Sequence, residues 1–273
     1  MQWVEPKIYK FGESHIDPDE AARFLDSIGA HDWLAKQPWY GAKSRDEIHS
    51  AEAITEIAGR SCYKSFGIGL NPNITRVRED SKDYIGNVLA KGDGSIFEHA
   101  VTHWIFQDVS RVFTHELVRH RAGVAISQES LRYVRPTELR MTMVPGSELS
   151  RMKNLKDLSR AVEANYAMYQ KIADDTITGD MKFDEKKAWT SALRRMLPDG
   201  IATTIVWSAN HRTLRWVLEM RTAPGAEVEM RYVFDKVGEI LVRDYAVIYQ
   251  DFVKEPHADG VGHQWIPKIR SKV

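Results

Sequence analysis

The chain has 273 residues, of which 43% are hydrophobic and 28% are charged, as in an ordinary soluble globular protein that buries a sizeable core. Its 38 Lys and Arg residues balance 38 Asp and Glu residues, so the composition excludes a global attraction to nucleic acid or to anionic lipid. The single cysteine, Cys62, excludes an internal disulfide and a cysteine-rich zinc site.

Neither a membrane span nor a signal peptide is expected. No apolar run approaches the roughly 20 residues that a membrane-spanning helix needs. The first residues, "MQWVEPKIYKFGES", lack the basic-then-apolar order of a signal peptide. We therefore expect a cytoplasmic protein with no membrane partner.

The first part of the chain is predicted to be mostly helical. Residues 1–45 form an N-terminal extension with a helix that starts after Asp17. Apolar residues recur at helical intervals over 46–63, and we expect Cys62 to be a buried, unreactive thiol there. A further helix over 80–91 ends at the glycine-containing "KGDGS".

Strand and helix signals alternate in the rest of the chain. β-Branched and aromatic residues predict a strand over 100–108, and Ser110 is a good N-cap for a helix over 110–121. The elements predicted after these are helices over 151–172 and 184–197, a strand over 201–209, a helix over 210–221, a long amphipathic helix over 226–252 and a Pro- and Gly-punctuated tail over 256–273. The fold class is α+β, mostly helical with a small sheet.

The stretch "RHRAGVAISQESLRYVRP", residues 119–136, concentrates cations in a chain without net charge. Four arginines surround His120, namely Arg119, Arg121, Arg132 and Arg135. Cations at the end of a helix are stabilised by its dipole and need no ligand, but guanidinium groups also offer paired donors to phosphate. Further donors follow within the same stretch: Ser127, Gln128, Ser130 and Tyr133. This density of donors favours a local anion site.

Two histidines raise the question of a metal. His99 and His103 would share a face of either a helix or a strand. The HExxH pattern is absent and no carboxylate-rich loop accompanies them, so no metal site is predicted.

Arg221 continues an apolar helical stripe formed by Leu214, Val217 and Leu218. An arginine at the end of such a stripe can extend to water, or it can point into a pocket. The residues around it leave both interpretations open.

An ordered set of motifs resembles the flavin-dependent thymidylate synthases. The RHR triplet is followed after eight residues by Ser130 and then by "LRYV", which is similar to the signature of that family. The likeness runs from about Ala51 to Val253 through "AGRSCYKS", "SIFEHAVTHWIF", "DVSRVFTHELVRHR", "LRRMLP", "NHRTLRWVLEMR" and "AEVEMR". The resemblance implies a catalytic domain over 46–255, between the N-terminal extension and the tail.

The resemblance also implies the assembly and the reaction. The family forms homotetramers in which helices surround a small curved antiparallel sheet, with active sites made where subunits meet. Its members use FAD reduced by NADPH, and they transfer a methylene group from 5,10-methylenetetrahydrofolate to C5 of dUMP, giving dTMP.

Site residues follow from the matching positions. The flavin would be held by Ser95, Arg119, His120, Arg121, Gln128, Asn210, His211, Arg212 and Trp216. The nucleotide would be bound by Glu116, Arg119, Gln128, Ser130, Arg132 and Arg194, and Arg221 would face the pyrimidine as the catalytic residue. Uracil C5 becomes nucleophilic when negative charge spreads over N3 and the carbonyl oxygens, and a fixed guanidinium stabilises that charge. No protein nucleophile is then needed, which suits a chain with one cysteine.

Four positions depart from the family pattern. Asp93 stands where a histidine on the flavin and folate side is usual, Glu116 replaces a glutamine, Trp216 replaces a small or polar residue, and Gly225 falls where a histidine can occur. These changes indicate a specialised member. The first alternative is therefore a UMP methylase, in which the Glu116 carboxylate accepts a hydrogen bond from the ribose 2′-hydroxyl.

Two further alternatives stay open. One is a flavoprotein that oxidises NADPH without methyl transfer. The other is a nucleic-acid-binding module that stacks bases on Tyr133, Trp207 and Trp216, although the zero net charge argues against it. A flavoprotein should be yellow, whereas a binding module should be colourless.

Overall fold

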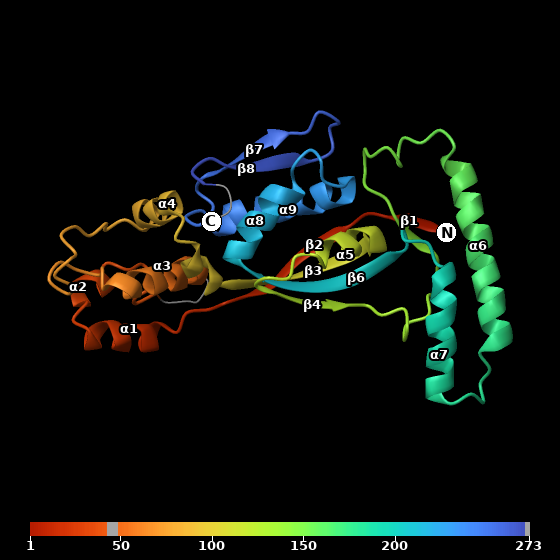
Figure 1. The fold of residues 1–273 in the computed structure, drawn as a ribbon, viewed down its shortest axis with the longest axis horizontal. Helices are drawn as coiled ribbons and strands as arrows, with labels where there is room; N and C mark the ends of the chain where they lie inside the picture. The colour runs from red at the N-terminus through yellow and green to blue at the C-terminus, as the bar shows by residue number, and fades with distance from the viewer. Residues whose placement is uncertain (43–48, 271–273) are drawn as a thin grey trace.

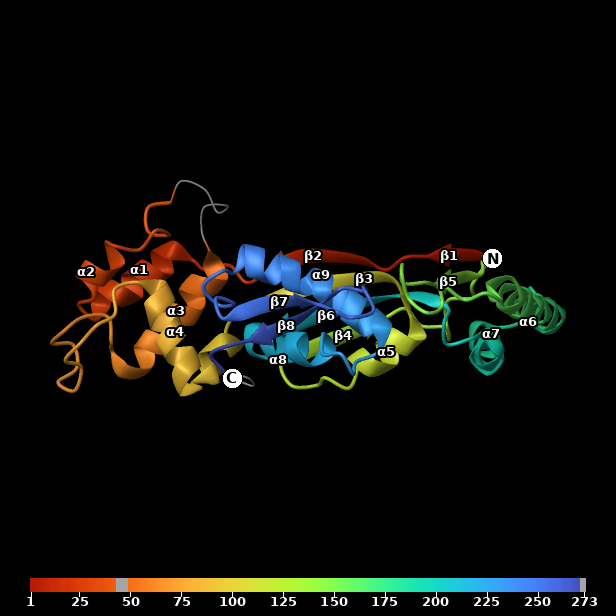
Figure 2. The ribbon, with the colours of Figure 1, turned by 90° about the horizontal axis from the view of Figure 1, so that it is seen from above.

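The computed structural model describes residues 1–42 and 49–270, which form an elongated molecule built around a central sheet (Figure 1). Four antiparallel strands lie in the order β2-β3-β6-β4. Their bounds are β2 (Lys7–Glu13), β3 (Val101–Ser110), β6 (Ala202–Asn210) and β4 (Val124–Gln128). Three helices cover one face of this sheet, α5 (Arg111–Leu117), α8 (His211–Arg221) and α9 (Val228–Asp244) (Figures 1 and 2).

The main core lies between the sheet and these helices. Alternate residues of β3 and β6 are buried, as expected for strands with one covered face. The Phe106 ring lies 5.5 Å from that of Phe113 on α5 and 6.1 Å from those of Trp207 and Phe234, all fully buried. Burial of side chains of this size contributes about 1.5–3 kcal/mol each, so this cluster fixes the helices on the sheet.

A helical lobe occupies one end of the molecule (Figure 1). It contains α1 (Pro18–Ser27), α2 (His31–Leu34), α3 (Ser50–Tyr63) and α4 (Ser81–Lys91). The carboxylate of Asp17 accepts hydrogen bonds from the backbone of Asp19 and Glu20, which confirms the predicted start of the first helix. The lobe has a small core of its own, formed by Leu25, Ala30, Trp33, Leu34, Trp39, Ala53 and Phe66.

A helical arm projects from the other end (Figure 1). It consists of α6 (Leu155–Thr176), α7 (Phe183–Leu193) and the 3₁₀ helix η3 (Arg194–Met196), next to the paired strands β1 (Gln2–Val4) and β5 (Arg140–Thr142). A second 3₁₀ helix, η2 (Gly94–Glu98), connects the helical lobe to β3. No helix of the described residues is long and apolar enough to cross a membrane.

Both ends of the chain are integrated into the main structure. The N-terminal extension supplies β2, which pairs with β3 at the edge of the central sheet. The tail forms a hairpin with β7 (Phe252–Pro256) and β8 (His263–Pro267), in which the Trp265 side chain is buried. A Cβ at Gly238 of α9 would come within 2.4 Å of Trp265 Nε1, so this close packing requires glycine.

The structure confirms several predicted elements and corrects others. The strands over 100–108 and 201–209 and the helix over 80–91 are present as β3, β6 and α4. The helix predicted over 110–121 ends at Leu117, and the one over 226–252 ends at Asp244, where Tyr245 leaves helical geometry.

Three further points differ from the sequence-based expectations. β4 was not predicted within the Arg-rich stretch. Cys62 lies on an exposed face of α3 and is not buried. Residues 46–48 of the predicted helix over 46–63 lie outside the described residues, and α3 begins at Ser50.

Candidate active site

The Arg-rich segment crosses the start of α8. Asn210 caps this helix, because its side-chain oxygen accepts a hydrogen bond of 2.9 Å from the Thr213 backbone. Its backbone N–H donates to Gly123 O at 3.1 Å, and Thr213 Oγ1 donates to Ala122 O at 2.7 Å. Gly123 has a φ of +66°, and a Cβ there would lie 2.3 Å from Asn210 Nδ2. Only glycine permits this close approach.

Arg221, at the end of α8, is held by two residues that flank the end of α5. Its Nε donates to His120 Nε2 at 2.7 Å, its Nη1 to Glu116 Oε2 at 2.5 Å and its Nη2 to Glu116 O at 3.1 Å. The Arg221 side chain is 15% exposed. Arg221 is therefore held against the end of α5 and does not extend to bulk water.

These contacts determine the protonation of His120. Because a guanidinium can only donate, Nε2 must accept and the ring proton lies on Nδ1. Burial, together with the Arg221 charge, lowers the pKa of His120 to about 4, so the ring is neutral at neutral pH. Its Nδ1 is buried and has no partner among the described residues, while the ring edge contacts Trp216 at a centroid distance of 5.1 Å. The site thus has a buried donor that a ligand could satisfy.

A cavity of about 410 Å³ lies beside Trp216, the residue that His120 contacts. It is lined by Glu98, Ala122, Gly123, Asn210, Arg212, Thr213 and Trp216. Three of the predicted flavin residues, Asn210, Arg212 and Trp216, thus lie together on its wall. Arg212 Nη1 lies 2.5 Å from Glu98 Oε1. A volume of this size, with an aromatic wall and a few polar groups, is typical of a cofactor site.

Ser95 and His211 have different positions relative to this cavity. Ser95 is exposed on η2, and since residues three apart are aligned in a 3₁₀ helix, it lies on the side of Glu98. His211 is fully buried, and its Nδ1 lies 3.0 Å from the Tyr249 hydroxyl. The structure corrects the prediction for His211, since its side chain has no surface to offer to a flavin and instead anchors the start of α8.

The other predicted ligands lie along β4 and the loop after it. Gln128 Nε2 donates to Thr114 Oγ1 at 3.1 Å, and Ser130 Oγ accepts from the Arg132 backbone at 3.3 Å. The side chains of Arg119 and Arg121, which follow α5, are exposed, as is that of Arg132. They are free to meet a ligand or a second subunit.

Arg111 is a candidate that the motifs did not reveal. Burial and the charge of nearby Arg194 lower the pKa of its guanidinium. Its Nη1 is buried and has no hydrogen-bond partner in the described part of the chain. Two neighbouring guanidinium groups with an unused buried donor are suited to a phosphate. One signal was available, because a cation in the first turn of a helix is unfavourable without an anion.

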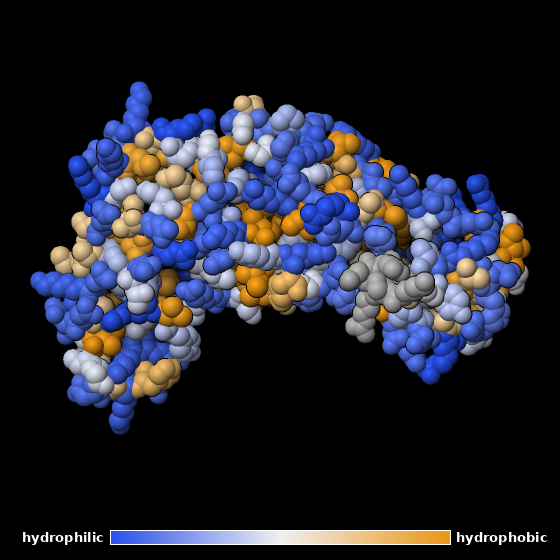
Figure 3. Space-filling model, turned by 180° about the vertical axis from the view of Figure 1, so that it is seen from behind, coloured by the Kyte–Doolittle hydropathy of each residue, from blue (hydrophilic) through white to orange (hydrophobic). Residues whose placement is uncertain are grey.

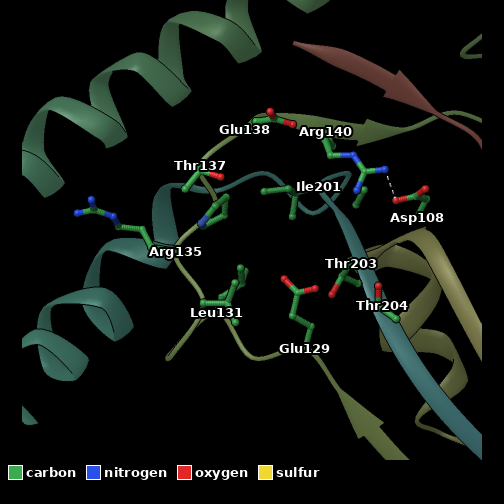
Figure 4. A pocket seen from close by; sticks show the side chains of 13 residues that line it. Asp108, Glu129, Leu131, Arg135, Thr137, Glu138, Arg140, Ile201, Thr203 and Thr204 are labelled. Carbon is green, nitrogen blue, oxygen red and sulfur yellow. Dashed lines mark ion pairs between the residues drawn. The ribbon is translucent and has the colours of Figure 1, made fainter. Parts of the chain in front are cut away.

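A second cavity, of about 280 Å³, lies on the other side of the loop after β4 (Figure 4). Glu129 and Thr203 point into it, whereas Arg135 points away and pairs with Asp174 at 3.3 Å. None of the predicted ligand residues lines this cavity. Arg135, the last guanidinium of the Arg-rich stretch, therefore binds the helical arm.

The histidines considered for a metal are not clustered. His103 Nδ1 lies 2.7 Å from Ser208 Oγ on the neighbouring strand. Within residues 1–42 and 49–270, no group of three or more His, Cys, Asp or Glu side chains is placed to hold a metal ion.

Comparisons with known proteins match most of this chain to one family. Residues 46–245 match the family described as thymidylate synthase complementing protein. A flavin-dependent thymidylate synthase from Corynebacterium efficiens is 31% identical over 220 residues, which cover 78% of this chain and 84% of the relative. A probable flavin-dependent thymidylate synthase of Mycobacterium phage D29 is 34% identical over 225 residues, covering 79% of this chain and 89% of the relative.

Solved structures support the mixed fold. The crystal structure of a UMP/dUMP methylase, PolB from Streptomyces cacaoi, bound with 5-Br dUMP has a TM-score of 0.63 at 15% identity, covering 92% of this chain and 96% of that one. The same protein bound with 5-Br UMP gives a TM-score of 0.61 at 14% identity, covering 92% and 95%. At this identity the likeness concerns the fold.

Proposed function

Because the chain belongs to the flavin-dependent thymidylate synthase family, we propose that it catalyses the reductive C5-methylation of a uridine monophosphate, converting dUMP to dTMP. The methylene group would come from 5,10-methylenetetrahydrofolate and the electrons from NADPH through FAD. The observation that carries this proposal is the Arg221 guanidinium, which His120 and Glu116 hold in a fixed position at the end of α5.

Arg221 is suited to activate a pyrimidine without a covalent bond to the protein. Uracil C5 becomes nucleophilic when negative charge spreads over N3 and the carbonyl oxygens, and a guanidinium fixed beside these atoms stabilises the ring in that charged form. Glu116 and His120 hold the group, so little reorganisation is needed during the reaction. No cysteine is required, and the exposed Cys62 lies on the helical lobe, away from α8.

The residues around the 410 Å³ cavity fit a flavin. Trp216 offers an aromatic wall, and Arg212 and Asn210 offer donors. Behind this wall, His120 contacts Trp216 and has a buried N–H without a partner among the described residues. Arg119, Arg121 and Ser95 would contact its pyrophosphate and ribose from the exposed rim. When bound, the flavin supplies the electrons, while the protein supplies position and charge.

The nucleotide phosphate would meet donors on the loop after β4 and on the arm. Ser130 and Arg132 offer a hydroxyl and an exposed guanidinium, with Gln128 at the end of the strand. Arg111 and Arg194 form a second cationic pair at the base of the arm. We propose that these two groups come from different subunits.

The open face of the sheet supports a homotetramer. Helices cover only one face, and the outline is concave between the lobe and the arm (Figure 3). Apolar rings are exposed on the edge strand, with Tyr9 at 45% and Phe11 at 54%. Since large exposed apolar patches mark association sites, we propose that second copies cover this face and complete the active sites.

Glu116 favours a second candidate substrate. One oxygen of its carboxylate pairs with Arg221, and Oε1 forms no hydrogen bond within the described residues. A carboxylate oxygen can accept from a ribose 2′-hydroxyl, which UMP carries and dUMP lacks. Both candidate substrates are tested by one experiment. The purified protein is incubated with NADPH, methylenetetrahydrofolate and either dUMP or UMP, and the nucleotide products are identified by mass analysis. Exclusive use of dUMP would remove the UMP proposal, and NADPH consumption without a methylated product would remove both.

A further inference from the structure

A cleft of about 160 Å³ on the helical lobe carries an excess of positive charge. It lies between α4 and the loop that follows α3. Its walls are formed by Arg60, Tyr63, Ser65, Ile74, Arg76, Val77, Arg78, Tyr84, Asn87, Val88, Lys91 and Asp93. We call it the basic cleft.

Most of its cations are available to a ligand. Arg76, Arg78 and Lys91 form no ion pair with any residue that the structure describes. Arg60 differs, because it is fully buried and paired with Glu56 at 2.6 Å, so its charge is neutralised within the lobe. Among the described residues that line the cleft, Asp93 is the single acidic one. The cleft therefore attracts anions.

A further guanidinium comes from the C-terminal segment. The Arg270 side chain lies directly over Gly92. In the sequence, Gly92 stands between Lys91 and Asp93, which both line the cleft. A Cβ at Gly92 would come within 2.2 Å of Arg270 Nη1, and Gly92 has a φ of +80°, so glycine is required there. Cations from the loop, from α4 and from the C-terminal segment thus gather at the same place.

The basic cleft is connected to the candidate flavin cavity by one short element. Asp93, on the cleft, immediately precedes η2, and Glu98, the last residue of η2, lines the flavin cavity. Five residues of 3₁₀ helix span about 10 Å at about 2.0 Å per residue. A ligand whose reacting end lies in the flavin cavity could therefore extend an anionic tail to the basic cleft.

We propose that the basic cleft binds the γ-linked glutamate carboxylates of the methylene donor, an inference that rests on the proposed function. Each added glutamate brings one more carboxylate, and the guanidinium groups of Arg76 and Arg78 offer paired donors to such groups. Asn87 adds an amide donor on the same wall. The cleft would make this protein selective for polyglutamylated donors.

The test compares the KM of the FAD-loaded protein for mono- and pentaglutamyl methylenetetrahydrofolate. Since an exposed ion pair contributes little on its own, several together give an expected preference of roughly tenfold for the pentaglutamyl form. The double variant Arg76→Gln/Lys91→Gln should lower this ratio to roughly twofold or less. The matched control Lys82→Gln/Lys171→Gln removes the same charge from exposed positions outside the cleft and should keep the ratio. Arg76→Lys should keep most of it.

Each other outcome overturns the inference. Equal KM values for the two donors in the wild-type protein would show that the tail is not recognised. Equal loss in the control variant would indicate a general charge effect. A rise in the KM for NADPH in the Arg76→Gln/Lys91→Gln variant with an unchanged donor ratio would assign the cleft to the phosphate of the reductant. Absence of turnover with either donor would contradict the proposed function as well, so the two failures are distinguishable.

Discussion

Replacement of Arg221 by lysine tests whether catalysis needs only a positive charge beside the pyrimidine or also the fixed position of that charge. Lysine keeps the positive charge, but it cannot reproduce the three hydrogen bonds to Glu116 and His120. Charge-assisted hydrogen bonds contribute about 1.5–3 kcal/mol each, and lysine can restore at most one or two of the three. We therefore expect the fixed position of the charge to be lost.

The expected result is a roughly 100- to 1,000-fold lower kcat, comparable to the loss of one preorganised donor at a developing anion. Bound flavin should be retained, which the visible absorption of the purified protein would show. Arg243→Lys is the control, because Arg243 is 70% exposed and pairs with Asp244 on the surface. A variant Arg221→Lys that keeps more than a third of the wild-type kcat would refute the assigned role.

Three further predictions concern other residues of the proposed site. Trp216→Ala should weaken flavin binding roughly tenfold or more, because the cavity loses its aromatic wall. The measurement is the Kd of FAD for the variant and the wild-type protein, and equal values would contradict the proposed flavin site. Arg111→Gln should raise the KM for the nucleotide roughly tenfold, because the phosphate loses one of two neighbouring guanidinium groups. A variant in which the Kd of FAD changes and the KM for the nucleotide does not would place the phosphate elsewhere. Folding lowers the pKa of His120 from 6.5 to about 4. Between pH 6.5 and pH 4 the unfolded chain therefore binds a proton on His120 that the folded protein does not bind, and the free energy of unfolding falls as the pH falls through this range. Urea unfolding at several pH values should show that His120→Gln removes up to about 3 kcal/mol of this loss, and parallel curves for variant and wild type would contradict the assigned pKa.

The sequence predicts the strands that carry a strong local signal. β3 and β6 alternate large apolar residues with smaller or polar ones, because one face packs against helices and the other is open. β4 escaped prediction because it has only five residues within the Arg-rich stretch, and it is defined by its pairing with β6, far along the chain. Pairing partners at long range leave no local pattern.

The site shows the same limit. The Arg-rich stretch predicts an anion site from donor density alone, but the contact of Arg221 with Glu116 joins residues 105 apart and depends on α5 ending at Leu117. The burial of His211 had an available signal, because His211, Leu214 and Leu218 share one helical face and the two leucines are apolar. Motif matching grouped His211 with Asn210 and Arg212, which line the flavin cavity, whereas helical periodicity places it in the core.

The central claim is that a guanidinium on α8 activates a pyrimidine monophosphate for methylation. Incubation with NADPH, deuterium-labelled methylenetetrahydrofolate and a pyrimidine monophosphate tests it most directly, with mass spectrometry of the nucleotide. The account predicts a product that has gained one labelled CH₂ group on its base, and predicts that Arg221→Lys forms little of it. An unaltered nucleotide from a flavin-loaded protein that consumes NADPH would contradict the account.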